Sequence, residues 1–317
     1  MIAGGALFGG PQHQAPTRGA DMVVATTYAN ETHFRRIERS ERWAHFYLVL
    51  PCLLFLALFF LLPIALFLSR SVFDPSFTLE HFAKALSRPV YMTVLFRTLT
   101  LALVTTAVTL VLGYPIAFVL THLKGRMKTV LFVLVVIPFW TNILVRMFAW
   151  LALLGSNGVI NSSLMELGVI GEPLPLLYNF LSVVIGMTHY MLPYMILPCY
   201  ATMEAIPKNL TDAAANLGAT PFTAFRRIFL PLSLPGVGAG CMLVFILSLG
   251  FYITPALMGG PQDTMFAQLI ETQINNTLDW GLAAALSTIL VVTTMGLFLV
   301  YSWILNVDKI YRGEAGR

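Results

Sequence analysis

Two ionisable side chains lie inside apolar runs, where a charge needs a specific reason. Arg146 lies in the stretch TNILVRMFAW and His189 in MTHYMLPYM. A charge within a membrane segment is costly, so it marks by default a buried partner or an aqueous pathway. Arg146 also lies past the middle of its run, from where a long side chain can reach the interface. Both interpretations of Arg146 stay open, and for His189 we favour hydrogen bonding within a helical bundle over a site role.

Motifs for chemistry on a substrate are absent from the chain. The sequence contains no G-x-x-x-x-G-K-[ST] phosphate loop, no H-E-x-x-H, no paired Cys-x-x-Cys and no Ser-His-Asp pattern. Its three cysteines, Cys52, Cys199 and Cys241, each lie in an apolar run without paired spacing, which is typical of small core residues. We therefore expect no catalytic residue, no metal site and no cofactor.

Composition places the chain in a membrane. Of its 317 residues 57% are hydrophobic and 11% are charged, whereas soluble domains contain roughly 25% charged residues. The net charge of +4 could suggest a nucleic-acid partner, but the basic residues cluster in short loops, as membrane topology requires. We expect membrane lipid as the surroundings and no nucleic-acid partner.

Six apolar runs are long enough to cross about 30 Å of hydrocarbon. The sequence predicts an all-α, polytopic helical bundle with transmembrane helices at about 46–68, 94–120, 130–154, 177–203, 232–257 and 282–305. Prolines interrupt several of these runs, at Pro115, Pro138, Pro193 and Pro198. Transmembrane helices tolerate them because neighbouring groups satisfy the freed backbone atoms.

The Lys and Arg residues predict the orientation. Most of the 19 lie in the 1–45 tail, in the loops after the second and fourth runs, and in the 306–317 tail. The opposite side has only a few, such as Arg70 and Arg88. Since cytoplasmic loops carry the excess of positive charge, both termini are predicted to be cytoplasmic. The loop after the fourth run is then cytoplasmic too.

That loop, TDAAANLGATPFTAFRRIFLPLSLPG, has strong helix-boundary signals. Pro207 can occupy the first position of a helix, and Gly218 can close that helix in the left-handed conformation. Thr220 can cap a second helix that has Pro221 at its first position. Pro231 and the later Pro235 are expected to stop this helix before the fifth run begins.

Both predicted helices have an apolar face. The first places Ile206, Leu210, Ala214 and Leu217 together, and the second places Phe222, Phe225 and Phe229 together. An apolar surface of this kind must be covered. It packs either under its own bundle or against a cytoplasmic partner, and the residues alone leave both open.

The segment DAAANLGA followed by IFLPLSLPG resembles the EAA loop of type I ABC-transporter permeases. The family pattern is roughly E-A-A-x-x-x-G, then about nine residues, then I-x-L-P, and Asp212 here replaces the Glu. The resemblance implies a helix–Gly–helix loop at 204–231 that couples to an ATPase. The implied coupling residues are Asp212, Ala213, Ala214, Leu217, Gly218, Ala219, Phe225, Ile228 and Pro231.

Three further stretches are similar to permeases of the spermidine/putrescine group: IPFWTNILVRMFAWLALLGSNGVIN, MTHYMLPYMILPCYATME and FYITPALMGGPQDTM. This resemblance implies a five-helix transmembrane domain at 94–305 of a bacterial inner-membrane importer that is not itself an enzyme. The implied partners are a cytoplasmic ATPase dimer, a second permease subunit in a heterodimer, and a periplasmic or lipoprotein substrate-binding protein. ATP hydrolysis by the ATPase would then drive alternating access.

The cargo is less well specified. Polyamines are polycations that carboxylates and aromatic faces recognise, but no carboxylate lies firmly inside a run, and Arg146 would repel a cation. The resemblance implies that selection mostly belongs to the binding protein, so a polyamine or a related small organic solute stays the expected substrate. We take as candidate pathway residues Trp140, Asn142, Arg146, His189, Tyr190, Tyr194 and Tyr252.

Two other classes of protein were weighed. An ion-coupled secondary transporter would need intramembrane carboxylates near the midplane, which the runs lack. A membrane-embedded enzyme would need a nucleophile or a metal cluster, and the sequence shows neither. Both therefore rank below a permease.

Overall fold

The structure is a computed structural model that describes residues 47–74 and 76–304, apart from the side chains of residues 208 and 304. Both predicted tails, 1–45 and 306–317, lie outside the described residues. The chain divides into two units, Met1–Leu66 and Phe67–Arg317. The described residues are mostly helical and form no strand beyond one isolated bridge between Phe73 and Phe77.

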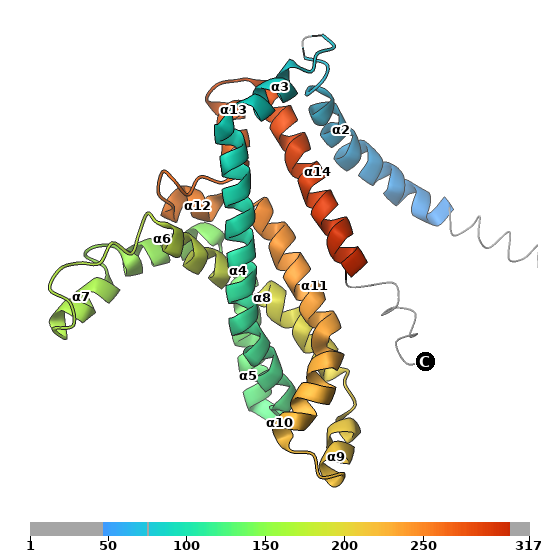
Figure 1. Ribbon diagram of the computed structural model, residues 1–317, viewed down its shortest axis with the longest axis vertical. Coiled ribbons are helices and arrows are strands. Elements are labelled where there is room, and N and C mark those ends of the chain that lie inside the picture. Colours follow the sequence, from blue (N-terminus) through green and yellow to red (C-terminus); the bar gives the residue numbers. More distant parts are fainter. Residues whose placement is uncertain (1–46, 75, 305–317) are drawn as a thin grey trace, which may run out of the picture. The chain divides into compact units, whose positions relative to one another are not determined.

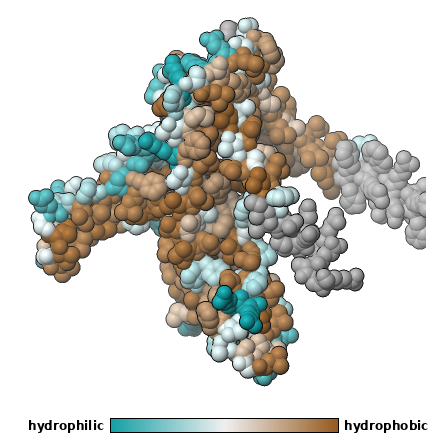
Figure 2. Space-filling view, viewed as in Figure 1, coloured by the Kyte–Doolittle hydropathy of each residue, from teal (hydrophilic) through white to brown (hydrophobic). Residues whose placement is uncertain are grey.

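Six helices are long and apolar enough to cross a membrane, as predicted. They cover Tyr47–Ser69, Pro89–His122, Ile143–Glu166, Phe180–Glu204, Pro221–Leu249 and Trp280–Trp303, of which the third is interrupted at residues 155–158. Figure 2 shows hydrophobic residues along the flanks of α4 and α14, and hydrophilic residues gathered near α3 and α13 and near α9. This distribution is what a bilayer-spanning bundle requires.

Within the described residues, a proline lies two positions after the end of each π-helical turn. The turn Ala57–Leu61 (η1) leads into α2 (Leu62–Ser69), which contains Pro63, and the turn Phe225–Phe229 (η3) precedes Pro231. Proline lacks an N–H, and its ring clashes with the carbonyl four residues earlier in an α-helix. The wider turn relieves that clash, so the helix continues.

Three helices form the centre of the second unit: α4 (Pro89–His122), α8 (Phe180–Glu204) and α11 (Leu230–Leu249) (Figure 1). Glycines permit their close approach. A Cβ on Gly113 of α4 would lie 3.0 Å from the Cγ of Met195, and one on Gly240 of α11 would lie 2.8 Å from its Sδ. Because lipid supplies no hydrophobic force between helices, such close packing holds them together.

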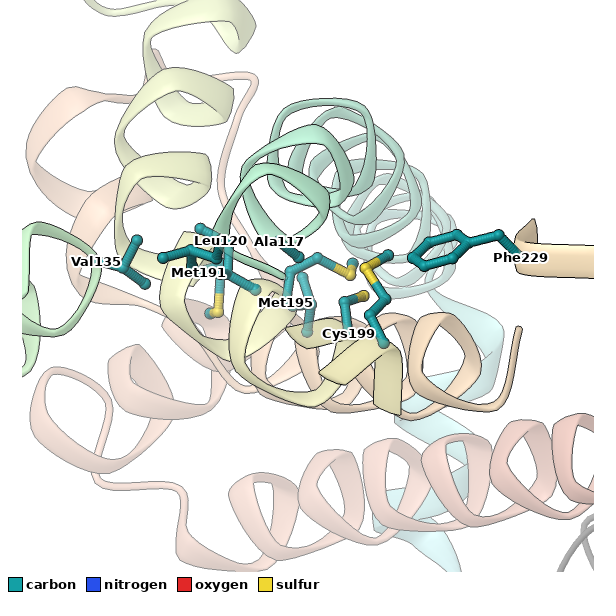
Figure 3. Packing of buried hydrophobic residues seen from close by; sticks show 10 residues of the cluster. Ala117, Leu120, Val135, Met191, Met195, Cys199 and Phe229 are labelled. Carbon is teal, nitrogen blue, oxygen red and sulfur yellow. The ribbon is translucent and has the colours of Figure 1, made fainter. Parts of the chain in front are cut away.

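Methionines of α8 fill the core between these helices. Figure 3 shows Met191, Met195 and Cys199 of α8 among Ala117 and Leu120 of α4, Val135 of α5 (Gly125–Val136) and Phe229 of η3. Val244 of α11 belongs to the same cluster. Unbranched, polarizable Met side chains adapt to the irregular gaps between tightly packed helices.

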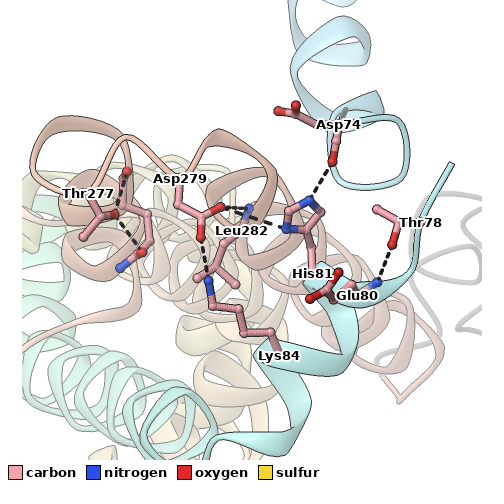
Figure 4. A network of polar contacts seen from close by, with 9 residues as sticks. Asp74, Thr78, Glu80, His81, Lys84, Thr277, Asp279 and Leu282 are labelled. Carbon is pink, nitrogen blue, oxygen red and sulfur yellow. Dashed lines mark hydrogen bonds and ion pairs between the residues drawn. The ribbon is translucent and has the colours of Figure 1, made fainter. Parts of the chain in front are cut away.

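A polar network joins the N-terminus of α14 (Trp280–Ile304) to α3 (Glu80–Ser87) (Figure 4). Asp279 accepts from Lys84 Nζ at 2.6 Å and from the backbone N–H of Leu282 at 3.0 Å, while His81 Nδ1 lies 3.9 Å away. Burial works to raise the pKa of Asp279, but the bonds from Lys84 and Leu282 outweigh it and lower that pKa. Asp279 therefore caps α14 and ties it to α3, and the helix α13 (Phe266–Asn275) packs beside them.

The predicted continuous span at 130–154 is wrong. The chain forms α5 (Gly125–Val136), a 3₁₀ turn at Ile137–Trp140 (η2) and then α6 (Ile143–Leu154), followed by α7 (Val159–Glu166). Pro138 cannot donate to the helix, and the side chain of Asn142 accepts from the N–H of Leu144 at 2.8 Å, which starts a new helix. Pro138 and Asn142 are both visible in the sequence, but the prediction followed the continuous hydrophobicity of the run instead.

The fifth predicted span also differs, at both ends. Its prolines do not stop the preceding helix, since α10 (Pro221–Ala224), η3 and α11 run on continuously. At the other end α11 finishes at Leu249, and residues 250–252 are not helical before α12 (Ile253–Met258). Hydropathy alone did not reveal this interruption.

Candidate functional site

The predicted helix–Gly–helix corner is present. The helix α9 (Lys208–Asn216) ends in a Schellman arrangement, in which Ala219 N–H donates to Ala214 O at 3.0 Å and Gly218 N–H donates to Ala215 O at 2.9 Å. Gly218 has φ +82°, a conformation that residues with a Cβ adopt at a cost. The Thr220 side chain accepts from Thr223 N–H at 3.3 Å and so caps α10.

The inner side of this loop packs on its own bundle. The ring of Phe118 in α4 meets Phe225 at 5.5 Å and Phe229 at 5.1 Å between centroids, both edge to face. Ala214 and Ala224 are buried as well. Ala219 and Ile228 are partly covered, whereas Asp212, Ala213 and Pro231 are exposed. Asp212 lines a cavity of about 350 Å³ that also has Glu204 in its wall.

Two large apolar side chains of the loop are more than two-thirds exposed. Leu217 is 88% exposed and Phe222 is 70% exposed, and they lie on either side of Gly218. Leu217 was predicted to share an apolar face with Ala214, but Ala214 is buried whereas Leu217 stays exposed. Leu217 is the C-cap of α9, and its N–H still donates to Ala213 O at 3.1 Å. We call Leu217 and Phe222 the apolar tip.

Four aromatic rings from three segments form a row near the middle of α8. Phe139 of η2 lies 4.9 Å from Tyr194, Tyr194 stacks on Tyr190 at 5.9 Å, and Tyr190 lies 4.9 Å from Phe251 between ring centroids. Phe139 and Phe251 lie at the two interruptions described above, at 137–142 and 250–252. We call these four residues the aromatic row.

Arg146 lies against this row. Its guanidinium carbon is 4.9 Å from the ring centroid of Tyr190, and one Nη donates to the carbonyl of Thr141 at 3.1 Å. Its Nε is buried without a hydrogen-bond partner, and no described carboxylate forms an ion pair with it. The structure thus places the charge on an aromatic face, without a carboxylate among the residues described.

His189 is hydrogen-bonded within the bundle, as expected. The indole N–H of Trp150 donates to Nδ1 of His189 at 3.1 Å. Because an indole nitrogen only donates, Nδ1 must accept, and the proton of the neutral ring lies on Nε2. No three His, Cys, Asp or Glu side chains are grouped closely enough to hold a metal in the described part of the chain.

Of the other predicted pathway residues, Trp140 and Tyr252 make no ring contact with the row within the part of the chain that the structure describes. Trp140 is 88% exposed, Asn142 caps α6, and Tyr252 is exposed just before α12. Conversely, Phe139 and Phe251 were not among the candidate residues. The signals that point to them are the neighbouring Pro138 and Gly250, which interrupt helices beside Tyr190 and Tyr194.

Comparison with known proteins decides the class. The family model "Binding-protein-dependent transport system inner membrane component" matches residues 110–308, which include the aromatic row and the apolar tip. The chain belongs to this family. It is accordingly a multi-pass inner-membrane permease subunit of a binding-protein-dependent ABC transporter.

Relatives in this family cover most of the chain. The spermidine/putrescine permease PotB of Escherichia coli K12 is 38% identical over 227 residues, which is 72% of this chain and 82% of that protein. PotB of Haemophilus influenzae is 33% identical over 259 residues, 82% of this chain and 89% of that protein. The molybdenum permease ModB of Mycobacterium bovis is 31% identical over 67% of this chain and 79% of its own length.

Solved structures share the fold. A bacterial ABC transporter that imports the acidic polysaccharide alginate matches with a TM-score of 0.64 at 16% identity, over 86% of this chain and 98% of that chain. The methionine transporter MetNI matches with a TM-score of 0.51 at 17% identity, over 71% of this chain and 98% of that chain. Identities this low establish the permease fold and no substrate.

Proposed function

We propose that this chain is the permease subunit of an ABC importer for polyamines. Identities of 33–38% to spermidine/putrescine permeases, over 72–82% of the chain, support the substrate class. The aromatic row supports it as well, because stacked phenol and phenyl faces attract organic cations. Residues 94–305 would form the transmembrane domain, with the coupling loop at 204–231.

The observation that carries the coupling role is the exposure of the apolar tip. Burying a Leu or Phe side chain contributes about 1.5–3 kcal/mol, so two such residues left uncovered beside a turn point to a partner surface. The Schellman arrangement at Gly218 and the contacts of Phe225 and Phe229 brace the loop against α4. A force applied to the tip would therefore reach the transmembrane helices.

The partner on the tip is proposed to be a cytoplasmic ATPase dimer, which hydrolyses ATP for a chain that lacks a phosphate loop. A second permease subunit would complete the pathway, and a substrate-binding protein would deliver polyamine on the opposite side. The positive charges of the tails and of the 204–231 loop support cytoplasmic termini. Alternating access would follow from closure of the ATPase dimer.

A pair of matched variants tests the coupling role. Leu217 precedes Gly218 (φ +82°) at the end of α9, and Leu167, 75% exposed, precedes Gly168 (φ +68°) at the end of α7. In cells lacking the native gene, Leu217→Glu should fail to restore uptake of radiolabelled spermidine, whereas Leu167→Glu should restore it. Both variants should reach the membrane in equal amounts, as measured by immunoblotting.

The same strain tests the substrate class. Deletion of the gene should abolish ATP-dependent uptake of spermidine and putrescine and leave molybdate uptake unchanged. Unchanged polyamine uptake, or a loss of molybdate uptake alone, would contradict the proposed substrate. Equal restoration by Leu217→Glu and Leu167→Glu would contradict the coupling role while leaving the substrate class intact.

Orientation has its own experiment. In a variant without its native cysteines, produced without the ATPase subunits, a single Leu217→Cys should react with a membrane-impermeant maleimide in inverted vesicles and stay unlabelled in intact spheroplasts. A single Leu167→Cys should show the opposite pattern. Labelling of both positions from the same side would exclude the proposed topology.

A further inference from the structure

The aromatic row lies near the middle of the bilayer, where non-helical backbone is unusual in a membrane protein. Helix α8 has 25 residues and spans about 37 Å, so Tyr190 and Tyr194, near its middle, lie near the bilayer midplane. The interruptions at 137–142 and 250–252 meet these two tyrosines through Phe139 and Phe251. Interrupted helices at the midplane are tolerated where they are buried in protein or line a cavity, and they are typical of transport sites.

The chemistry of the row suits an organic cation. Four ring faces or edges follow one another with centroid separations of 4.9, 5.9 and 4.9 Å. Such a row offers electron-rich faces to an ammonium group and apolar edges to a methylene chain. A linear diamine has both parts, and its recognition here would need no carboxylate.

A cation already occupies this row. The guanidinium of Arg146 lies 4.9 Å from the ring centroid of Tyr190, which is the position that an ammonium group would take. Arg146 is held loosely there, by one hydrogen bond to the carbonyl of Thr141, with its Nε buried and unpartnered. Among the described residues no carboxylate pairs with it. It therefore has few interactions to lose on leaving.

We propose that Arg146 is a tethered plug: its guanidinium fills a cation-binding site on Tyr190 and Tyr194 in the resting transporter, and an amine substrate displaces it. The identity of the amine rests on the proposed function, whereas the competition between Arg146 and a cation does not. The plug explains how a pathway for cations contains an arginine.

Equilibrium binding of radiolabelled putrescine to the purified transporter complex, without nucleotide or binding protein, tests the plug. Removing the competing cation–π contact in Arg146→Ala should tighten binding by about 2- to 30-fold. Arg146→Gln, which keeps a donor for the Thr141 carbonyl, should give a similar gain and guards against misfolding of the alanine variant. Adding Tyr190→Leu to either variant should remove the gain.

Arg97→Ala is the matched control. Arg97 also donates one hydrogen bond to a backbone carbonyl, that of Gln262 at 2.8 Å, but it has no ring contact among the described residues. Putrescine binding by this variant should equal that of the wild type. An equal gain in Arg97→Ala and Arg146→Ala would show a general charge effect and overturn the plug.

The remaining outcomes separate the two proposals. If the wild type imports polyamine with ATP but neither Arg146 variant binds putrescine more tightly, the plug is wrong and the proposed function stands. If polyamine uptake fails but the Arg146 variants bind putrescine more tightly, the plug stands and the substrate assignment falls. Weaker binding in both Arg146 variants would show that Arg146 does not compete with the cation, and would also overturn the plug.

Discussion

The indole N–H of Trp150 donates to Nδ1 of His189 across 3.1 Å and thereby joins α6 to the middle of α8. This bond helps to hold α6, the helix that begins after the turn at 137–140, against α8. Arg146 of α6 thereby lies against the aromatic row. The bond also selects the His189 tautomer that has its proton on Nε2. The geometry of the row thus depends on a contact that lies beside it.

Trp150→Phe should lower the stability of the transporter measurably. The phenyl ring preserves much of the packing but cannot donate, so Nδ1 of His189 loses its partner at a cost of about 1 kcal/mol. The control is Trp303→Phe on the exposed face of α14, which should change stability by less than about 0.5 kcal/mol. Thermal unfolding in detergent measures both, and equal shifts would contradict a specific role for the Trp150 bond.

Gly218→Ala should impair transport through backbone strain alone. A Cβ at this position would meet nothing within 4 Å, but φ +82° costs an L-residue roughly 1–2 kcal/mol. Gly168→Ala is the control, because Gly168 also has a positive φ of +68° and open space around its Cβ position. This variant should lose a similar amount of stability but keep its uptake activity. Retained spermidine uptake in Gly218→Ala would show that the angle of the loop does not matter for coupling.

The Asp279 network should make stability depend on pH. The folded-state pKa of Asp279 lies below the ordinary value of 3.8, so its contribution is fully present above about pH 4 and is lost as the pH falls through the folded pKa. Asp279→Asn should therefore be less stable than the wild type at pH 7 and equally stable once the carboxyl is protonated. For a partly exposed pair we expect a difference of about 0.2–1 kcal/mol, measured by unfolding at several pH values. A difference that does not change with pH would contradict the charge-based role.

Close helix packing should make Gly236→Ala destabilising. Its Cβ would lie 2.6 Å from Oγ1 of Thr202 and 2.7 Å from the carbonyl of Pro198, and overpacking of this kind costs about 1–3 kcal/mol. Gly296→Ala in α14 meets nothing within 4 Å and should be neutral or stabilising by up to about 1 kcal/mol, since Ala favours helix. Equal thermal stability of the two variants would count against tight contact between α8 and α11.

The sequence by itself determined the features that depend on local physics. Hydrophobic length predicts six spans, since a bilayer imposes that length on any helix that crosses it. The corner at Gly218 and the cap at Thr220 were also predictable, because a left-handed glycine and an N-cap act within a few residues.

Only the tertiary structure decided which apolar residues are covered and which rings meet. Phe139, Tyr190 and Phe251 are far apart in sequence and come together because two helices break beside a third. Helical periodicity places Leu217 on the same face as Ala214, but Ala214 is buried and Leu217 is exposed. Burial depends on the elements that pack against a residue, and one segment read alone does not contain that information.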